Sequence, residues 1–219
     1  MIETLTDPDE IAAAEARQRG RLAAAGLPEA WAATGEVFRD QYVSIVRDAV
    51  RFPSGELGTY IRVGRGSAVA GGVVAVPRLG DRYVLVRHWR HATRRYHLEF
   101  PRGCVEPGES GLQAVLRELA EEIGARIVGF APVGRVYPDT GTLSDTVEVF
   151  AVDVAATRLP QAAADEGIAA VELHAFDGLM DLAGSGLLDD AITLAALIKE
   201  RAWRAATRDV AADYGVAAG

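Results

Sequence analysis

Residues 103–125 read GCVEPGESGLQAVLRELAEEIGA, and the second half of this stretch has the pattern of a helix. Ser110 suits the N-cap, and Gly124 suits the left-handed residue that ends a helix. Glu118, Glu121 and Glu122 then project from nearly one face, because residues three and four apart lie within one turn. Like charges at this spacing destabilise a helix by about 0.2–0.5 kcal/mol per pair, so a neutralising partner is expected.

These three carboxylates have two interpretations. Their density suits a hard divalent cation, Mg²⁺ or Mn²⁺, which takes oxygen ligands and keeps waters for a phosphate-bearing substrate. The alternative is a solvated helix face, since glutamate favours helices and acidic runs are common. Arg117 can pair with Glu121 at i+4 or reach back to Glu109. Taken alone, the glutamates leave both interpretations open.

The flanking residues decide between them. The positions that recur at fixed spacing are Gly103, Glu109, Arg117, Glu118, Glu121, Glu122 and Gly124. This spacing matches the Nudix box in every fixed position, and the chance of such a match is on the order of one in a million. The chain therefore resembles the Nudix hydrolases, which cleave a nucleoside diphosphate linked to another moiety, over residues 42–200.

The resemblance implies an α+β fold, an α/β/α sandwich with a mixed β-sheet. It implies that Glu118 and Glu122 are the main metal ligands, that Glu121 assists, and that the backbone carbonyl of Arg102 is a further ligand. Structural roles are implied for three other box residues, which are Gly103, Glu109 and Arg117.

The stretch before the box, VLVRHWRHATRRYHLEFPRG at residues 84–103, is similar to the ADP-ribose pyrophosphatase branch of this family. Arg90 matches the arginine that contacts a substrate phosphate in that branch, and Glu99 matches its supporting glutamate. Arg102 stands where that branch has alanine, so the mouth of the site is expected to differ. Trp89 and Tyr96 suit stacking on a base, but core positions are favoured for them.

Two loops after the box bear on substrate and catalysis. Residues 137–141 read YPDTG, with Thr140 where the branch has the second proline that marks ADP-ribose, which leaves the substrate open. Ala-Asp-Glu at residues 164–166 resembles the mobile loop that carries a catalytic glutamate. Glu166 is the match, with Asp165 next to it, and an ordinary acidic surface loop is the alternative.

Diphosphate hydrolysis needs an in-line water, a stabilised phosphate charge and a carboxylate that accepts the proton from water. The hypothesis is that Glu166 is this base, with Glu121 as the alternative, and that Arg90 grips a phosphate oxygen. ADP-ribose would yield AMP and ribose 5-phosphate. The rival interpretations are a Nudix pyrophosphatase for a nucleotide sugar, CDP-alcohol or dinucleotide, and a sensor that binds ADP-ribose without cleaving it.

The composition is that of an ordinary globular protein, with 219 residues, 49% of them hydrophobic, and a formal net charge of −8. This charge argues against nucleic acid or an anionic membrane as a partner. The single cysteine, Cys104, excludes an internal disulfide and is interpreted as a small space-filler. The acidic N-terminus is unlike a signal peptide, so a cytoplasmic location is expected. The four histidines are expected at the surface or near phosphate.

The chain is divided into four expected parts. Residues 1–41 are expected to form a helical arm, and residues 42–65 an antiparallel hairpin that serves dimerisation. The Nudix domain is expected over residues 66–205 and a flexible tail over residues 206–219. The hairpin, placed as in the ADP-ribose pyrophosphatase branch, predicts a homodimer.

Overall fold

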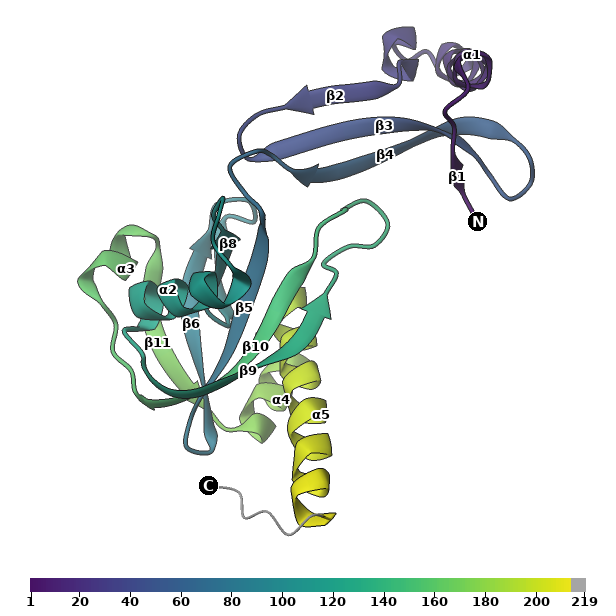
Figure 1. Cartoon of the computed structure of the whole chain (residues 1–219). Coiled ribbons are helices and arrows are strands. Elements are labelled where there is room, and N and C mark those ends of the chain that lie inside the picture. Colours follow the sequence, from purple (N-terminus) through teal and green to yellow (C-terminus); the bar gives the residue numbers. More distant parts are fainter. Residues whose placement is uncertain (214–219) are drawn as a thin grey trace. The chain divides into compact units, whose positions relative to one another are not determined.

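The computed structural model describes residues 1–213, and the chain divides into two compact units. The smaller unit holds Met1–Val69 and Asp139–Asp145, and the larger holds Ala70–Pro138 and the chain from Thr146 onward. Figure 1 labels the elements of both units. No helix in the described part of the chain is long and apolar enough to cross a membrane.

The smaller unit is built on an antiparallel sheet. Its strands are β1 (Glu3–Thr4), β2 (Gly35–Arg39), β3 (Val43–Arg51) and β4 (Leu57–Arg65). Strands β3 and β4 pair from Val43 opposite Arg65 to Arg51 opposite Leu57, which confirms the predicted hairpin. The segment Asp139–Asp145 belongs to this unit because it lies against β4, where the Val63 amide donates to the Thr142 carbonyl at 2.9 Å.

The predicted N-terminal helix is present as α1 (Pro8–Ala24). It begins after Asp7, whose carboxylate accepts from the backbone amide of Asp9 at 2.9 Å. A short 3-10 helix, η1 (Glu29–Ala32), follows. Strand β2 corrects the prediction of a wholly helical arm over residues 1–41, because it pairs with β3. All of its residues are exposed, so the sequence carried no alternation of apolar residues to reveal it.

The larger unit contains a mixed sheet in the order β11-β6-β5-β10-β9, with β7 beside β6 and β8 beside β5. The strands are β5 (Gly71–Leu79), β6 (Arg82–Arg90), β7 (Arg95–Glu99), β8 (Arg102–Val105), β9 (Arg126–Val136), β10 (Val147–Ala156) and β11 (Ile168–His174). Strands β5 and β10 are parallel, and the other neighbours are antiparallel. The predicted mixed sheet is therefore confirmed.

The two central strands β5 and β6 separate along their length. They pair with each other at Arg78 opposite Tyr83 and at Leu79 opposite Arg82. Beyond this point β6 pairs with β7, and β5 pairs with β8. The turn that joins β7 to β8 therefore lies where the central strands diverge, and Glu99 and Arg102 stand at its two ends.

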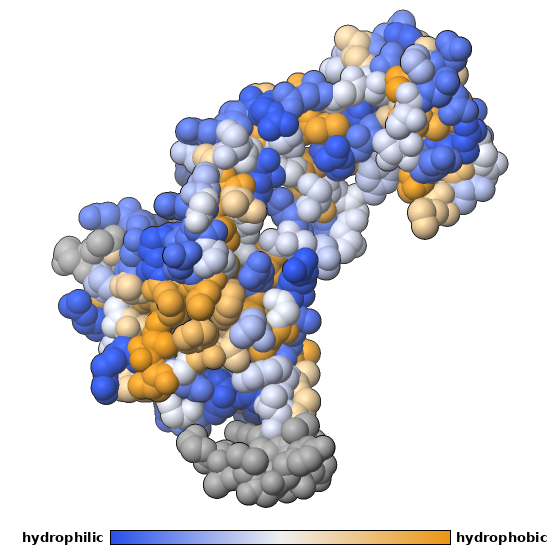
Figure 2. All heavy atoms as spheres, viewed as in Figure 1, coloured by the Kyte–Doolittle hydropathy of each residue, from blue (hydrophilic) through white to orange (hydrophobic). Residues whose placement is uncertain are grey.

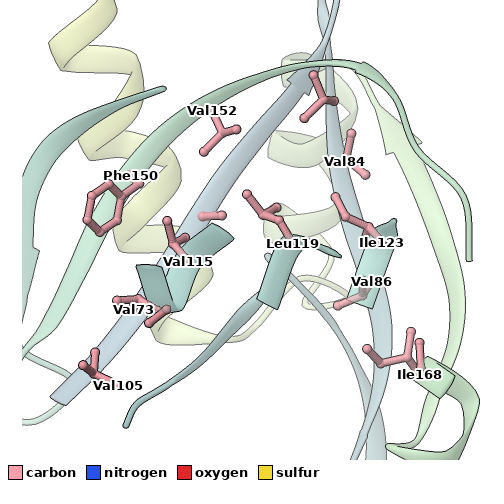
Figure 3. Close-up of a cluster of buried hydrophobic side chains, with 14 residues drawn as sticks. Val73, Val84, Val86, Val105, Val115, Leu119, Ile123, Phe150, Val152 and Ile168 are labelled. Carbon is pink, nitrogen blue, oxygen red and sulfur yellow. The ribbon is translucent and has the colours of Figure 1, made fainter. Parts of the chain in front are cut away.

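Helices cover both faces of this sheet (Figure 1). Helix α2 (Gly111–Ile123) packs on one face through Leu119 and Val115, which meet Val73 and Val152 in a buried apolar cluster (Figure 3). Helices α4 (Phe176–Gly184) and α5 (Ala191–Asp213) pack on the other face, and α3 (Gln161–Asp165) precedes β11. The α/β/α sandwich is confirmed.

The C-terminal helix changes one predicted boundary. Helix α5 extends to Asp213, so residues 206–213 continue the helix instead of beginning a tail. The rest of the predicted tail, residues 214–219, lies outside the described residues.

Several large apolar side chains lie at the surface. In the smaller unit they include Trp31, Phe38 and Tyr42, and on the edge strand β9 they include Val128 and Phe130. Figure 2 shows apolar side chains gathered beside α2 on the visible face of the larger unit. These exposed residues form apolar surface that is available for contacts with another chain.

Some predicted burials are wrong. Trp89 and Tyr96 were favoured as core residues, but they are 39% and 49% exposed and contact each other edge-to-face on paired strands. Cys104 was interpreted as a space-filler, but it is exposed. The four histidines were expected at the surface or near phosphate, and two of them, His88 and His97, are buried. Successive side chains of a strand point to opposite faces of the sheet, and the packing around the sheet decides which face is covered.

Candidate active site

Helix α2 carries the acidic residues of the box, and its ends are defined by local contacts. The Gln113 amide donates to the Ser110 hydroxyl at 3.2 Å, and the Ser110 amide donates to the Gln113 side chain at 2.9 Å. Gly124 ends the helix with a φ of +50°. The apolar side of the helix packs in the core, and this orientation buries Glu118 and Glu122 as well.

Arg117 joins the loop before the helix to the helix itself. Its guanidinium binds both carboxylate oxygens of Glu109, at 3.2 and 3.1 Å, and donates to the Cys104 carbonyl at 3.0 Å. Its Nη1 also donates to Glu118 at 2.8 Å and Glu121 at 3.1 Å. Both pairings considered from the sequence, with Glu109 and with Glu121, are present. The hydrogen bond from Arg117 lowers the pKa of Glu109.

Gly103 makes room for Glu118. A Cβ atom at Gly103 would lie 1.8 Å from Oε1 of Glu118, a distance that no side chain can adopt. The carboxylate of Glu118 thus lies directly against the backbone of β8. Burial raises the pKa of Glu118, and the hydrogen bond from Arg117 offsets only part of this rise.

Glu122 is the most unusual group of the box. Its side chain is 2% exposed, and its Oε2 atom has no hydrogen-bond partner among the described residues. Burial and the facing charge of Glu118 raise the pKa of Glu122 to about 8, although Arg90 and the backbone amide of Arg102 act against this. A buried carboxylate without a partner is costly, so this oxygen is poised to accept a cation.

The three glutamates predicted to converge differ in burial. Glu118 and Glu122 are buried together, whereas Glu121 is 47% exposed in its side chain and pairs with Arg117. Among the described residues, no group of three or more His, Cys, Asp or Glu side chains is arranged to hold a metal ion. The two buried carboxylates, one with an unpartnered oxygen, still fit a hard divalent cation.

Glu166 lies close to this pair, although two strands and a helix separate them in the sequence. It ends α3, is exposed, and its charge contributes to the raised pKa of both Glu118 and Glu122. The loop is tied to β6, since the Trp89 amide donates to the Gly167 carbonyl at 2.9 Å. The structure therefore brings Glu166 near the box.

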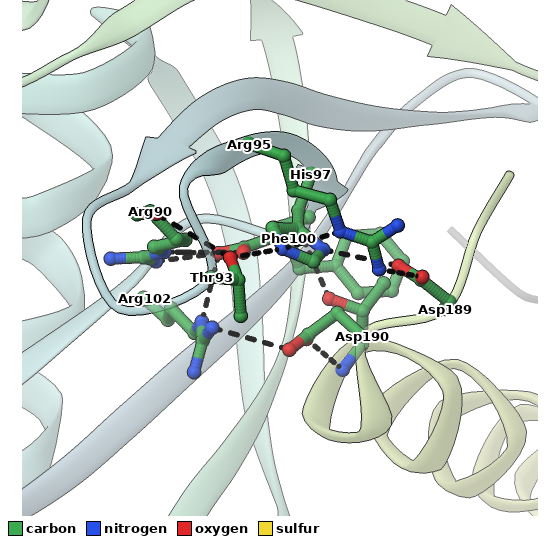
Figure 4. Close-up of polar contacts among 10 residues, drawn as sticks. Arg90, Thr93, Arg95, His97, Phe100, Arg102, Asp189 and Asp190 are labelled. Carbon is green, nitrogen blue, oxygen red and sulfur yellow. Dashed lines mark hydrogen bonds and ion pairs between the residues drawn. The ribbon is translucent and has the colours of Figure 1, made fainter.

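Arg90, Glu99 and Arg102 form a second charged group at the divergence of β5 and β6 (Figure 4). Glu99 is 1% exposed and accepts from Arg90 Nε at 2.9 Å and from Arg102 Nε at 3.1 Å. Burial acts to raise the pKa of Glu99, but the hydrogen bonds from Arg90 and the charge of Arg102 outweigh it and lower the pKa.

Asp190 is a member of this group that the sequence did not identify as a site residue. One of its oxygens accepts from Arg102 Nη2 at 3.2 Å, and the other accepts from the Thr193 amide at 2.8 Å. Its neighbour Asp189 binds His97 at 3.0 Å. Asp190 is visible in the sequence as a polar residue, but its partner Arg102 lies 88 residues away in the chain.

The comparisons with known proteins agree with this geometry. The NUDIX domain matches residues 68–195. The ADP compounds hydrolase NudE of Escherichia coli (strain K12) is 42% identical over 52 residues, which are 24% of this chain and 28% of that protein. The ADP-ribose pyrophosphatase of Bacillus subtilis (strain 168) is 29% identical over 124 residues, which are 57% of this chain and 65% of that protein.

A solved structure shares the fold. The crystal structure of an ADP compounds hydrolase superposes with a TM-score of 0.67 at 22% identity, covering 80% of this chain and 93% of that one. The chain covers less than two thirds of the length of both curated relatives. The matched domain, residues 68–195, makes up more than half of the 219 residues and includes the whole box. The chain therefore belongs to the Nudix family.

Proposed function

We propose that this protein is a Nudix hydrolase that cleaves a nucleoside diphosphate linked to another moiety. The observation that carries the proposal is the pair of buried carboxylates, Glu118 and Glu122, in which one oxygen of Glu122 has no partner within the described part of the chain. Such a pair is unfavourable in an empty fold and favourable beside a divalent cation that also contacts phosphate.

Glu118 and Glu122 would hold the cation, Mg²⁺ or Mn²⁺, with the Arg102 carbonyl as a further ligand and Glu121 assisting. When bound, a divalent cation neutralises phosphate charge and makes a coordinated water more acidic. Gly103 leaves space for the carboxylate of Glu118, because glycine has no Cβ atom. Structural roles go to Gly103, Glu109 and Arg117.

Glu166 is the proposed general base, with Glu121 as the alternative. Glu166 is exposed and near Glu118 and Glu122, as the effect of its charge on both pKa values indicates. An exposed carboxylate beside the site can accept the proton of an attacking water and pass it to solvent. Glu121 is held by Arg117 at 3.1 Å, which leaves it less free to do so.

Arg90 binds a phosphate oxygen, and Glu99 orients it. Glu99 engages Nε and Nη2 of Arg90, so the direction of the guanidinium is fixed before substrate binds. The planar fork of arginine suits phosphate oxygens. Charge on Glu122 also acts on Arg90, which places this guanidinium at the border of the box.

ADP-ribose is the proposed substrate, with water as the second reactant and AMP and ribose 5-phosphate as products. The name of the Bacillus subtilis relative supports this choice. A second candidate is another ADP-linked compound, supported by the name of the Escherichia coli relative and by Thr140 at the position of the missing second proline. Nucleotide sugars, CDP-alcohols and dinucleotides complete the panel to be tested.

The smaller unit is proposed to form the interface of a homodimer. Its hairpin, β3 and β4, and its exposed Trp31, Phe38 and Tyr42 supply apolar surface of the kind found at subunit contacts. Light scattering coupled to gel filtration should give twice the chain mass. A monomer at micromolar concentration would contradict this part of the proposal.

The experiment that tests the activity is phosphate release from the substrate panel, with Mg²⁺ and a coupled phosphatase. Wild type is compared with Glu122→Gln and with Glu106→Gln, an exposed glutamate of the loop before α2, as the control. We expect metal-dependent turnover of ADP-ribose that is lost in Glu122→Gln and kept in Glu106→Gln.

Other outcomes would change the proposal in defined ways. Turnover of a different panel member would keep the mechanism and move the substrate. Binding of ADP-ribose without cleavage of any panel member would contradict the enzyme proposal and support a sensor that binds ADP-ribose.

A further inference from the structure

The pocket between β7, β8 and the start of α5 contains a feature that the box does not explain. Its volume is about 410 Å³, and its lining includes Arg90, Thr93, Glu99, Arg102 and Asp190. The lining residues are mostly polar or charged, which is unusual for a cavity that serves packing alone.

Two guanidiniums in this pocket share one buried carboxylate. Glu99 accepts from Nε and Nη2 of Arg90 and from Nε of Arg102. Two positive charges thus stand around a single negative charge that is 1% exposed. With Asp190 as a second carboxylate at Arg102, the two guanidiniums are balanced in charge, and they offer an anion N–H donors instead of a net positive charge.

Asp190 holds the other end of Arg102. It engages Nη2 of Arg102 at 3.2 Å while its second oxygen caps the first turn of α5 through the Thr193 amide. Arg102 is therefore held at Nε by one strand and at Nη2 by a helix. This arrangement removes most of the conformational freedom of a long side chain before any ligand arrives.

Both guanidiniums keep donors for a ligand. In the described part of the chain, neither Arg90 nor Arg102 makes a hydrogen bond through Nη1, since each uses only Nε and Nη2. The two side chains are 30% and 22% exposed. In Figure 4, Arg90 and Arg102 each have a guanidinium nitrogen that carries no dashed line.

From this geometry we infer that Arg90 and Arg102 form a two-guanidinium site for a phosphoryl group of the nucleotide, with Asp190 as the positioning residue for Arg102. The inference rests on the proposed function for the identity of the anion, because a diphosphate is the anion expected beside the box. Arg102, which stands where the resembled branch has alanine, is then a specificity-determining residue.

The test is calorimetric binding of ADP in EDTA, which requires no turnover. We expect Arg102→Ala to weaken ADP binding about tenfold and to reduce its salt dependence. Arg102→Lys keeps the charge and loses the planar fork of arginine, so its ADP affinity should lie between those of wild type and Arg102→Ala. Arg82→Ala, at the far end of β6, removes the same charge and should bind ADP like wild type.

A purely structural role for Arg102 would give a different result. The variant Arg102→Ala would then have a lower thermal midpoint than wild type and the same ADP affinity, and that outcome would overturn the inference. Failure of wild type to bind ADP would overturn it as well. If wild type binds ADP through Arg102 but cleaves nothing, the proposed function fails and this site stands.

Asp190→Asn separates positioning from folding. Asparagine caps helices as well as aspartate, so α5 is retained while the charge that holds Arg102 is lost. On the cleaved substrate we expect KM to rise several-fold with kcat nearly unchanged, and ADP affinity to fall in parallel. Unchanged KM and unchanged ADP affinity in this variant would show that Asp190 does not position Arg102.

Discussion

Glu122 and Glu200 are both buried glutamates on helices that pack against the same sheet, but their surroundings differ. Glu200 is 0% exposed, accepts from the Tyr83 hydroxyl at 2.9 Å, and pairs with Arg204. Arg204 in turn binds Asp153 on β10 at 2.8 Å. Glu122 is 2% exposed and has an oxygen without a partner among the described residues.

This difference distinguishes a carboxylate that holds the fold together from one that waits for a ligand. A buried charge is tolerated when hydrogen bonds and a counter-charge replace its water, and Glu200 has both. Glu122 has a like charge beside it instead, and its pKa is raised to about 8. Substitutions at the two positions should therefore affect different properties.

The largest expected effect is on activity. Glu122→Gln should lower kcat/KM on the cleaved substrate by at least about 100-fold, because a metal ligand is lost, with no fall in thermal stability. Glu200→Gln should keep kcat/KM within a few-fold of wild type. Equal losses of activity in both variants would remove the distinction between the two glutamates.

The pH dependence of stability follows from the raised pKa of Glu122. A carboxyl with a raised pKa in the folded state contributes stability that is present below its unfolded pKa, near 4.5, and is lost as pH rises through about 8. In EDTA, the free energy of unfolding should fall by roughly 3 kcal/mol between pH 5 and 8 from this group. Urea unfolding measures it.

Two controls sharpen this measurement. Millimolar Mg²⁺ should restore stability at pH 8, because a cation stabilises the ionised form. Glu122→Gln should lack most of the slope in EDTA. A wild-type slope that neither Mg²⁺ nor this substitution changes would contradict the assignment to Glu122.

Glu200→Gln should act on stability. Loss of the charge opposite Arg204 leaves a partly buried guanidinium poorly compensated, so we expect a loss of about 2 kcal/mol. For a chain of this size, that corresponds to a thermal midpoint lower by roughly 4–8 °C in a calorimetric scan. A midpoint equal to that of wild type would show that the buried pair adds nothing to stability.

Tyr83→Phe should give the smallest effect. It removes one hydrogen bond to Glu200 and keeps the ring in its apolar cluster, so we expect a loss of about 1 kcal/mol. Chemical unfolding with the same slope for both proteins would measure it. A loss larger than that of Glu200→Gln would mean that the Tyr83 hydroxyl, and not the ion pair of Glu200 with Arg204, is the main contact.

The sequence predicted best where the deciding contacts are local. The ends of α2 at Ser110 and Gly124 depend on contacts within a few residues, and both were predicted correctly. The pairing of Arg117 with Glu121 is also local, one helical turn apart. The predicted hairpin has the same character, because its strands are neighbours in the chain.

Predictions failed where a distant segment decides the environment. Strand β2 forms because β3 offers it a backbone edge, and no pattern of its own side chains announces it. Trp89 and its strand partner Tyr96 are exposed although Tyr83 and Leu85, on the same face of β6 as Trp89, are buried, so size did not predict burial. Glu121 was grouped with Glu118 and Glu122 by spacing, and Arg117 does join it to Glu118, but only Glu118 and Glu122 are buried.

The sequence by itself determined the family, the acidic helix and the residues to examine. The reason is that the spacing of the box residues is a property of the chain and can be read without knowledge of the fold. Only the tertiary structure decided which carboxylates are buried, and which are satisfied. Burial and hydrogen bonding depend on groups such as Asp190 and Arg102, which lie 88 residues apart and meet only when the sheet and α5 pack together. For this reason Glu122 and Glu200 look alike in the sequence and differ in the fold.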